Sequence, residues 1–150
     1  MANLIFWEKR GCLGNAGQKA LLRASGHLLD VRDLREEVWT PARLRPFFGD
    51  RPIAAWFNPR APKVVRREVR PETLDEAEAL AMLVAEPLLI RRPLLAVAGP
   101  GRSGLACASG FDPAWIEAAT GAPMVGEGGE TCPREAMGGS CEPAAAKASA

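Results

Sequence analysis

The sequence predicts a mixed α/β domain, and three observations support this class. Residues 3–33 follow the order strand, helix, strand, which is typical of two parallel strands joined by a right-handed crossover. A helical middle section covers residues 39–86, and a β-hairpin with a final helix covers residues 94–120. With 150 residues the chain is long enough for one hydrophobic core, so we expect one domain with a C-terminal tail.

The first three elements surround a cysteine. Apolar residues predict a strand over residues 3–7, and a helical pattern predicts a helix over residues 15–25. Gly26 suits the left-handed position that often follows a helix, and the second strand is expected over residues 27–33. The predicted buried face of the helix consists of Ala16, Ala20, Leu21 and Ala24.

Proline and capping residues divide the middle section into short helices. Thr40 suits an N-cap and Pro41 a first helical turn, and Asp50 with Pro52 repeats this arrangement before Asn58. The section is rich in large apolar residues, which predict a core beneath a helical layer, with a partner-binding surface as the alternative. These residues are Trp39, Leu44, Phe47, Phe48, Trp56 and Phe57.

A basic stretch and a further helix follow. We expect residues 60–70 to be a solvated loop, with a docking patch for an anion or an acidic partner as the alternative. The run from Thr73 to Glu76 has the pattern of a capping box, which predicts a helix that ends before Pro87. The predicted inner face of this helix consists of Leu74, Ala77, Ala81 and Val84.

The next elements are a hairpin and a helix. Pro93 opens a buried strand over residues 94–97, and residues 105–107 are the expected partner strand. Asp112, followed by proline, predicts the start of a helix over residues 114–120.

The composition changes after residue 121. Gly, Glu, Pro, Ala and Ser dominate residues 122–150, and periodic apolar positions disappear. We therefore expect a folded domain over residues 1–121 and a disordered tail over residues 122–150. Cys132 and Cys141 lie in this tail, and their spacing indicates no particular site.

Charge and composition argue against several classes of function. The formal net charge of +1 gives no field suited to nucleic acid or to a membrane surface, and no uncharged run reaches the ~20 residues of a membrane span. The N-terminus lacks the features of a secretory signal. The four cysteines form no CxxC pair and His27 is far from them in sequence, so we expect no bound metal or cofactor. A reducing, cytoplasmic setting fits this cysteine usage.

Cys12 is the most informative residue, because it lies between the first strand and the first helix. Backbone N–H groups at the start of a helix, together with the positive end of the helix dipole, favour a thiolate. Lys9 and Arg10 add positive charge just before it. The position therefore predicts a reactive thiol, with a small idle or buried cysteine as the alternative.

Several short motifs occur together between residues 3 and 117. They are Phe6-Trp7-Glu8-Lys9, Gly11-Cys12, Gln18-Lys19-Ala20-Leu21-Leu22, Gly26-His27, Val31-Arg32-Asp33-Leu34, Trp39-Thr40, Phe47-Phe48-Gly49, Trp56-Phe57-Asn58, Ala61-Pro62 and Leu88-Leu89-Ile90-Arg91-Arg92-Pro93-Leu94. As a set they resemble the arsenate reductase family and its Spx-type relatives. Within that group the chain most closely resembles the nitrogenase-associated proteins encoded among nitrogen-fixation genes.

The resemblance implies a fold and a site. The fold is thioredoxin-like, with a βαβ unit, inserted helices, a β-hairpin and a C-terminal helix. Pro93 is implied to be a cis proline that faces the cysteine loop, and Arg92 to hold an oxyanion beside the Cys12 thiol, a task that suits the two-pronged guanidinium. An ordinary surface or ion-pairing arginine is the alternative for Arg92.

Two departures from the family pattern bear on the activity. Where arsenate reductases and Spx-type proteins carry an arginine shortly after the cysteine, this chain has Asn15, Ala16 and Gly17. Asn15 also stands where CxxC members have a second thiol, so this loop cannot close a disulfide of its own. We place Asn15 with Arg92 and Pro93 among the expected oxyanion- or substrate-binding residues, and Cys12 as the catalytic residue.

Three functions follow from these expectations. The first is an accessory or regulatory protein of nitrogen fixation that binds a partner, such as a nitrogenase component or a maturation factor, with Cys12 as a redox-active thiol. The alternative is a monothiol oxidoreductase of the arsenate reductase type, with glutathione as co-substrate and glutaredoxin to restore Cys12. An Spx-like regulator that binds polymerase is the third, and the missing CxxC pair argues against it.

Overall fold

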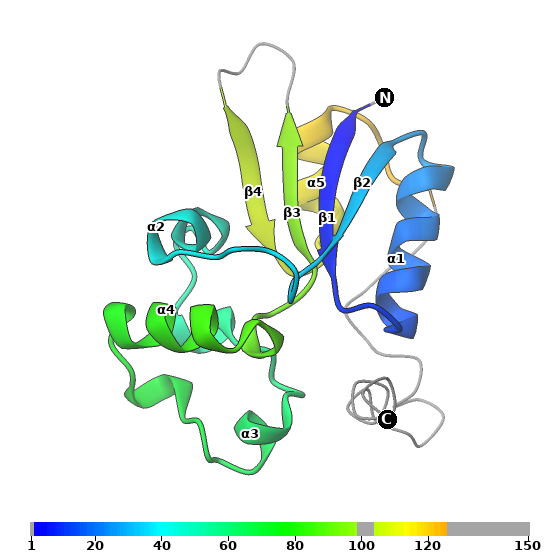
Figure 1. Cartoon of the computed structure of the whole chain (residues 1–150). Coiled ribbons are helices and arrows are strands. Elements are labelled where there is room, and N and C mark those ends of the chain that lie inside the picture. The colour runs from blue at the N-terminus through cyan, green and yellow to red at the C-terminus, as the bar shows by residue number, and fades with distance from the viewer. Residues whose placement is uncertain (1, 99–103, 126–150) are drawn as a thin grey trace.

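The sheet has four strands in the order β2-β1-β3-β4 (Figure 1). In this computed structural model, residues 2–98 and 104–125 are described. The strands are β1 (Asn3–Glu8), β2 (Leu28–Asp33), β3 (Leu94–Ala98) and β4 (Leu105–Ser109). β1 and β2 are parallel, whereas β3 is antiparallel to both β1 and β4. The predicted βαβ unit and hairpin are therefore confirmed.

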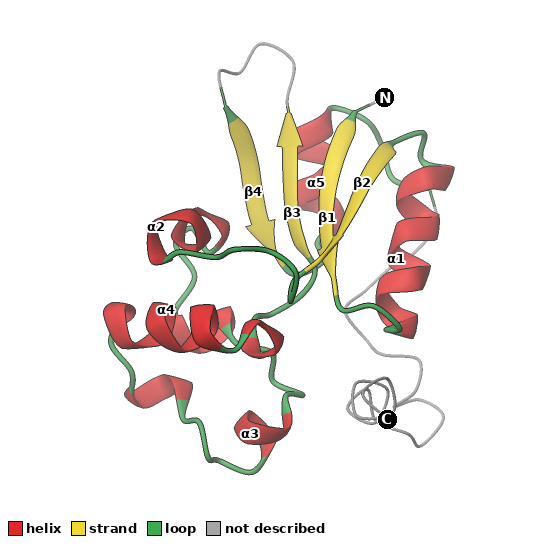
Figure 2. Ribbon diagram, in the orientation of Figure 1, coloured by secondary structure: helices red, strands yellow, loops and turns green. Residues whose placement is uncertain are grey.

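Two helices cover one face of the sheet. They are α1 (Leu13–Ala24) and α5 (Pro113–Thr120), shown with the strands in Figure 2. Leu4 and Phe6 of β1 alternate with residues of the other face and pack with Leu95 and Val97 of β3 and Ile116 of α5. Side chains that alternate along a strand point to opposite faces, so β1 and β3 contribute to two separate cores.

The helical middle section covers the other face at one end of the sheet. It contains α2 (Pro41–Leu44), α3 (Pro62–Val65), α4 (Glu76–Ala85) and four 3₁₀ turns. Its aromatic residues are buried, which confirms the predicted core. Trp7 of β1 packs edge-on against Phe47 with ring centroids 5.3 Å apart, and Phe48 stacks on Trp56 at 4.8 Å.

Two predicted helix faces were only partly correct: Leu21, Leu74 and Val84 pack against the cores, but the alanines of both faces do not. In α1 the buried residues are Asn15, Gln18 and Leu22, and the three alanines of the predicted face are exposed. Asn15 and Gln18 can be buried because their side chains bond to each other at 2.9 Å.

The inner face of α4 also differs, because Leu80 and Leu83 are buried while Ala77 and Ala81 are exposed. Burying a leucine removes more apolar area from water than burying an alanine, so the helix turns its leucines inward. The capping box is formed by Asp75, which caps α4 with Glu78, rather than by the predicted pair of Thr73 and Glu76.

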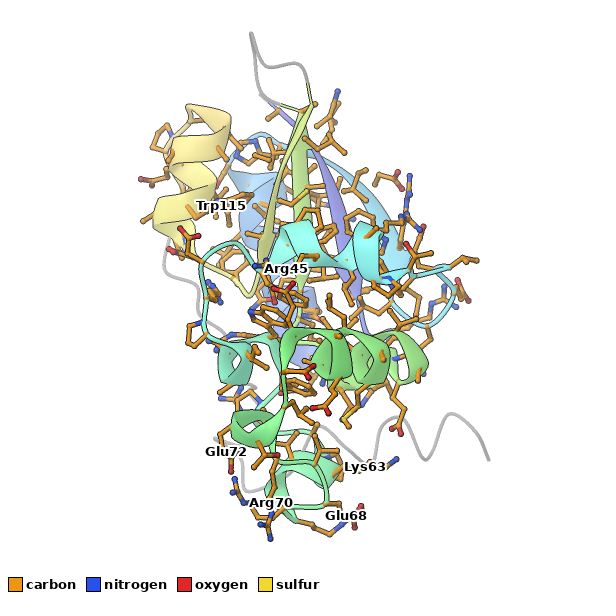
Figure 3. All side chains as sticks on the ribbon, turned by 90° about the vertical axis from the view of Figure 1, so that its left-hand side faces the viewer. Arg45, Lys63, Glu68, Arg70, Glu72 and Trp115 are labelled. Atoms are coloured by element: carbon orange, nitrogen blue, oxygen red, sulfur yellow. The ribbon has the colours of Figure 1, made fainter. Side chains whose placement is uncertain are left out.

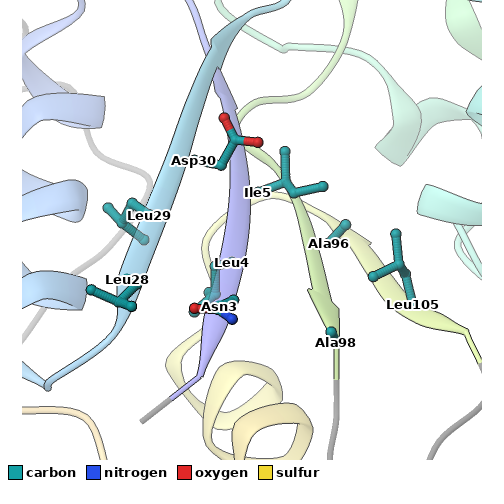
Figure 4. Close-up of a pocket in the computed structure, with 9 residues that line it drawn as sticks. All are labelled: Asn3, Leu4, Ile5, Leu28, Leu29, Asp30, Ala96, Ala98 and Leu105. Carbon is teal, nitrogen blue, oxygen red and sulfur yellow. The ribbon is translucent and has the colours of Figure 1, made fainter.

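Trp7 lies at one end of its sheet face. At the opposite end, shown in Figure 4, none of the described helices covers the strands, and we call it the open end. A hollow of about 340 Å³ crosses all four strands there, lined by residues that include Ile5, Asp30, Ala96 and Leu105. Leu28 and Leu105 are 56% and 54% exposed at its edges. Within the described part of the chain, the middle section covers only the half of this face that carries Trp7.

The chain after α5 runs back to α1. Gly121 ends α5 in the left-handed conformation. Met124 N–H donates to Glu117 Oε1 at 2.8 Å, and Val125 N–H donates to Ser25 Oγ at 2.9 Å. Residues 126–150, which hold most of the predicted tail, lie outside the described residues. Within the described part, none of the helices has the length and apolar character needed to cross a membrane.

Candidate functional site

Cys12 is the N-cap residue of α1. Its backbone is extended, Cys12 N–H donates to Lys9 O at 3.1 Å, and Cys12 O accepts from Ala16 N–H at 3.1 Å. The helix begins at Leu13, two residues earlier than predicted, and no side chain among the described residues caps it. The half-buried thiol therefore lies at the start of α1.

Arg92 lies against this thiol. Leu94 pairs with Trp7, so the residues just before β3 lie at the same end of the sheet as the turn that follows β1. Burial lowers the pKa of Arg92, whereas its electrostatic and hydrogen-bonding interaction with Cys12 raises it. The structure thus brings Cys12 and Arg92 together, and the bond between Arg92 and Pro93 is cis.

Two further arginines approach Arg92; Arg35 was not predicted, and Arg60 was considered only as part of the basic stretch of residues 60–70. The charges of Arg35 and Arg60 each lower the pKa of Arg92. Arg35 follows the end of β2, and Arg60 follows the segment that pairs with residues 89–91 through two backbone hydrogen bonds. The sequence pattern Asp-Leu-Arg around Arg35 offered a weak signal, because an Arg two residues after an Asp can fold back onto it.

Asp33 connects Arg35 to the cysteine loop. Its carboxylate accepts from the Arg35 side chain at 2.8 and 3.0 Å, from Arg35 N–H at 2.8 Å and from Arg10 N–H at 3.2 Å. Burial would raise the pKa of Asp33, but the hydrogen bonds from Arg35 and Arg10 bring it down to about 2. Asp33 is therefore a fixed negative charge between the loop and Arg35.

Asn15 holds the cysteine loop from the other side. Its Oδ1 accepts from Lys9 N–H at 3.3 Å, its Nδ2 donates to Gln18, and it is only 3% exposed. Nearby, Lys19 forms an ion pair with Glu8 at 2.7 Å. These contacts give Asn15 a structural role in the loop, while its predicted contact with a substrate stays a prediction.

The other cysteines are placed differently. Cys107 lies in the edge strand β4 opposite Ala96, which itself pairs with Ile5, whereas Cys12 lies beyond the end of β1. Burial raises the pKa of Cys107, so its reactive thiolate is disfavoured. Cys132 and Cys141 lie outside the described residues, and within the described part no group of His, Cys, Asp and Glu side chains could hold a metal ion.

The basic stretch of residues 60–70 is largely paired with acidic groups of the same chain. Lys63 pairs with Glu86, Arg66 with Glu68 at 2.9 Å, and Arg67 with Glu72. Figure 3 shows Lys63, Glu68, Arg70 and Glu72 together at the far end of the middle section. Such pairing leaves little unbalanced charge for the docking patch that was the alternative interpretation.

Comparisons with known proteins agree with this architecture. An arsenate reductase from Vibrio cholerae has a TM-score of 0.61 at 16% identity, over 79% of this chain and 98% of its own. An arsenate reductase (ArsC) related protein from Brucella melitensis has a TM-score of 0.54 at 22% identity, over 77% and 92%. No family model matches the sequence. The sheet order and the likeness to these structures define a thioredoxin-like fold, with one cysteine at the start of α1.

A relative from Rhodospirillum rubrum defines the family more narrowly. It is named "Uncharacterized 15.7 kDa protein in draG 3'region", and it is 50% identical over 149 residues, which cover 97% of this chain and all of that protein. The chain belongs to the family of this protein.

Proposed function

We propose that this chain is an accessory protein of nitrogen fixation that binds a partner protein and reacts with it through Cys12. The observation that carries the proposal is the Arg92 guanidinium against the Cys12 thiol at the start of α1. The motifs shared with nitrogenase-associated proteins support the biological setting. The name of the Rhodospirillum rubrum relative, with its reference to draG, adds a weak indication in the same direction.

The chemistry open to this site is thiol–disulfide exchange. The Cys12 thiolate attacks one sulfur of a disulfide on the partner or on glutathione, and the other sulfur leaves with the bonding electrons and takes a proton from water. Asn15 stands where a second thiol would resolve the product within the loop. The mixed disulfide therefore persists until a thiol from outside the loop reduces it, which suits a regulated contact with a partner.

A second function is favoured by the arginines near Arg92. A monothiol oxidoreductase of the arsenate reductase type would use Cys12 as nucleophile and Arg92 to hold the oxyanion, with glutathione and glutaredoxin as reductants. Arg35 and Arg60 would add positive charge around a bound anion. This function requires turnover, whereas the accessory function requires only binding.

One experiment separates the two. The wild-type chain and Cys12→Ser are used to capture proteins from cells grown under nitrogen-fixing conditions, with release by a thiol reductant and identification by mass spectrometry. In parallel, arsenate reduction is measured with glutathione and glutaredoxin. A nitrogenase component or maturation factor released by reductant from the wild type alone supports the accessory function. Turnover that is lost in Cys12→Ser, without such a partner, would support the oxidoreductase instead.

A further inference from the structure

Asp33 is bonded at once to the cysteine loop and to Arg35. β1 and β2 end together, because Glu8 pairs with Asp33 and Leu34 N–H donates to Glu8 O at 2.9 Å. From this position the Asp33 carboxylate reaches Arg10 N–H in the turn that leads to Cys12. A movement of Arg35 relative to this turn would break one of the hydrogen bonds of Asp33. These bonds therefore hold Arg35 and the turn in fixed positions relative to each other.

Arg35 reaches outward from a buried anchor. The side chain of Asp33 is 3% exposed, whereas that of Arg35 is 37% exposed. The pair uses Nε and Nη2 of the guanidinium, and Nη1 has no partner among the described residues. A guanidinium fixed on one side and exposed on the other is suited to donate a directed hydrogen bond to a carboxylate or an oxyanion.

The same end of the sheet gathers Arg35, Arg92 and Cys12. Glu8 pairs with Asp33 and Trp7 pairs with Leu94, so the segments after β2 and before β3 flank the turn after β1. The mutual repulsion of Arg35 and Arg92 agrees with this placement, since it lowers the pKa of Arg92. A co-reactant whose sulfur meets Cys12 therefore lies close to two guanidinium groups on separate segments.

We propose that Arg35, anchored by Asp33, is a specificity-determining residue of the Cys12 site that favours disulfides with carboxylates near the sulfur over uncharged disulfides. This inference rests on the proposed thiol exchange at Cys12. In that exchange the new S–S bond forms to Cys12 as the old one breaks, and the leaving thiolate takes a proton from water. Arg35 acts on the approach of the disulfide through its charge and hydrogen bond, and it takes no part in breaking the bond.

The test compares rates for two disulfides. The full-length chain with Cys107, Cys132 and Cys141 replaced by Ser is reacted with oxidised glutathione, which is net negative, and with hydroxyethyl disulfide, which is uncharged. Formation of the mixed disulfide is followed by mass spectrometry. In Arg35→Gln we expect the ratio of the two rates, glutathione over hydroxyethyl, to fall roughly fivefold, the effect of one half-exposed charged contact. In Arg35→Lys the ratio should lie between those of the wild type and Arg35→Gln, because lysine keeps the positive charge but lacks the paired N–H donors of the guanidinium.

A matched control comes from the same strand. Arg32 also forms a fork on an aspartate two residues before it, with both nitrogens on Asp30 Oδ2 at 3.1 and 2.7 Å. Asp30 is 55% exposed and has no hydrogen bond to the cysteine loop among those of the described residues. Arg32→Gln should therefore leave the ratio unchanged.

Two results would overturn the proposal, and they differ in meaning. If Arg35→Gln slows the reaction of Cys12 with both disulfides by the same factor, Arg35 only stabilises the cysteine loop through Asp33 and does not select the disulfide. If Cys12 reacts with neither disulfide in the chain that keeps Arg35, the proposed exchange at Cys12 is wrong. The proposed specificity of Arg35 is then wrong as well. A far-UV circular dichroism spectrum confirms that each variant is folded.

Discussion

The two ends of the sheet bury different kinds of groups. At the end that carries Cys12, the buried polar or charged residues have partners, and they include Glu8, Lys9, Asn15, Gln18, Asp33 and Ser109. At the open end the surface is an apolar hollow, and His27 is buried nearby with Nε2 unpartnered among the described residues. Burying polar groups costs free energy unless they are bonded. At the Cys12 end this cost is offset by pairing, whereas His27 near the open end keeps one nitrogen without a partner among the described residues.

The largest effect that this comparison predicts is the loss of exchange in Cys12→Ser. In a chain whose Cys132 and Cys141 are also replaced by Ser, mixed-disulfide formation of Cys12→Ser with oxidised glutathione at pH 7 should fall below detection, because serine cannot form the bond. Cys107→Ser, in the edge strand, should keep the wild-type rate, since burial raises the pKa of Cys107 and leaves little thiolate. Intact mass spectrometry of both variants provides the measurement. A wild-type rate of mixed-disulfide formation in Cys12→Ser would show that the exchange does not take place at this end of the sheet.

The second prediction concerns the arginine that contacts the thiol. Arg92→Ala should slow alkylation of Cys12 by neutral iodoacetamide at pH 7 roughly tenfold, the effect of losing one charged hydrogen-bond partner of about 1.4 kcal/mol. Arg92→Lys keeps the charge and should lose less. The assay uses the background in which the other three cysteines are serine. An unchanged rate in Arg92→Ala would mean that Arg92 is an ordinary buried arginine.

The sequence predicted the backbone of this end better than its side chains. The βαβ order, the position of Cys12 and the proximity of Arg92 could be anticipated, because they follow from local patterns and from a resemblance. Arg35 could not, since its approach to Arg92 depends on strand register across the sheet. The buried face of α1 was missed for a related reason: Asn15 and Gln18 are inward only because they bond to each other and to the loop. Hydrophobic periodicity cannot detect a face whose burial depends on such bonds.

Strong acid, in the range between about pH 4 and pH 2, should weaken the end with Cys12. The pKa of Asp33 is about 2 in the folded chain, below its ordinary value of 3.8, so its contribution to stability is complete above about pH 4 and is lost as the pH falls towards 2. The shift corresponds to about 2 kcal/mol. Asp33→Asn should therefore lower the free energy of unfolding at pH 7 by about this amount, with the difference shrinking near pH 2.

Urea unfolding at several pH values measures this contribution. Asp30→Asn is the control, because Asp30 forms the same kind of fork in an exposed position on the same strand. We expect it to change the free energy of unfolding at pH 7 by less than about 0.5 kcal/mol. Equal losses in the two variants would show that the buried network adds nothing beyond an exposed ion pair.

The other end should respond to pH in a different range. Burial, followed by the positive N-terminus, lowers the pKa of His27 below 6.5, so the unfolded chain binds a proton more readily than the folded chain. Stability should therefore be full above pH 6.5 and fall as the pH drops below it. His27→Asn keeps an acceptor for Ala2 N–H, which donates to His27 Nδ1 at 3.4 Å, and cannot titrate there. Its unfolding should lose this pH dependence, and an unaltered dependence would assign the effect to another group.

The smallest effect is expected at the open end itself. Leu28 is 56% exposed at the edge of the hollow, so Leu28→Lys removes little buried apolar area and leaves the lysine charge in water. The free energy of unfolding should change by less than about 0.5 kcal/mol, and alkylation of Cys12 should keep its wild-type rate. Both are measured in the same preparations as the Asp33 variants. A loss above about 1 kcal/mol would mean that something covers Leu28 in solution, because an exposed leucine contributes little to folding.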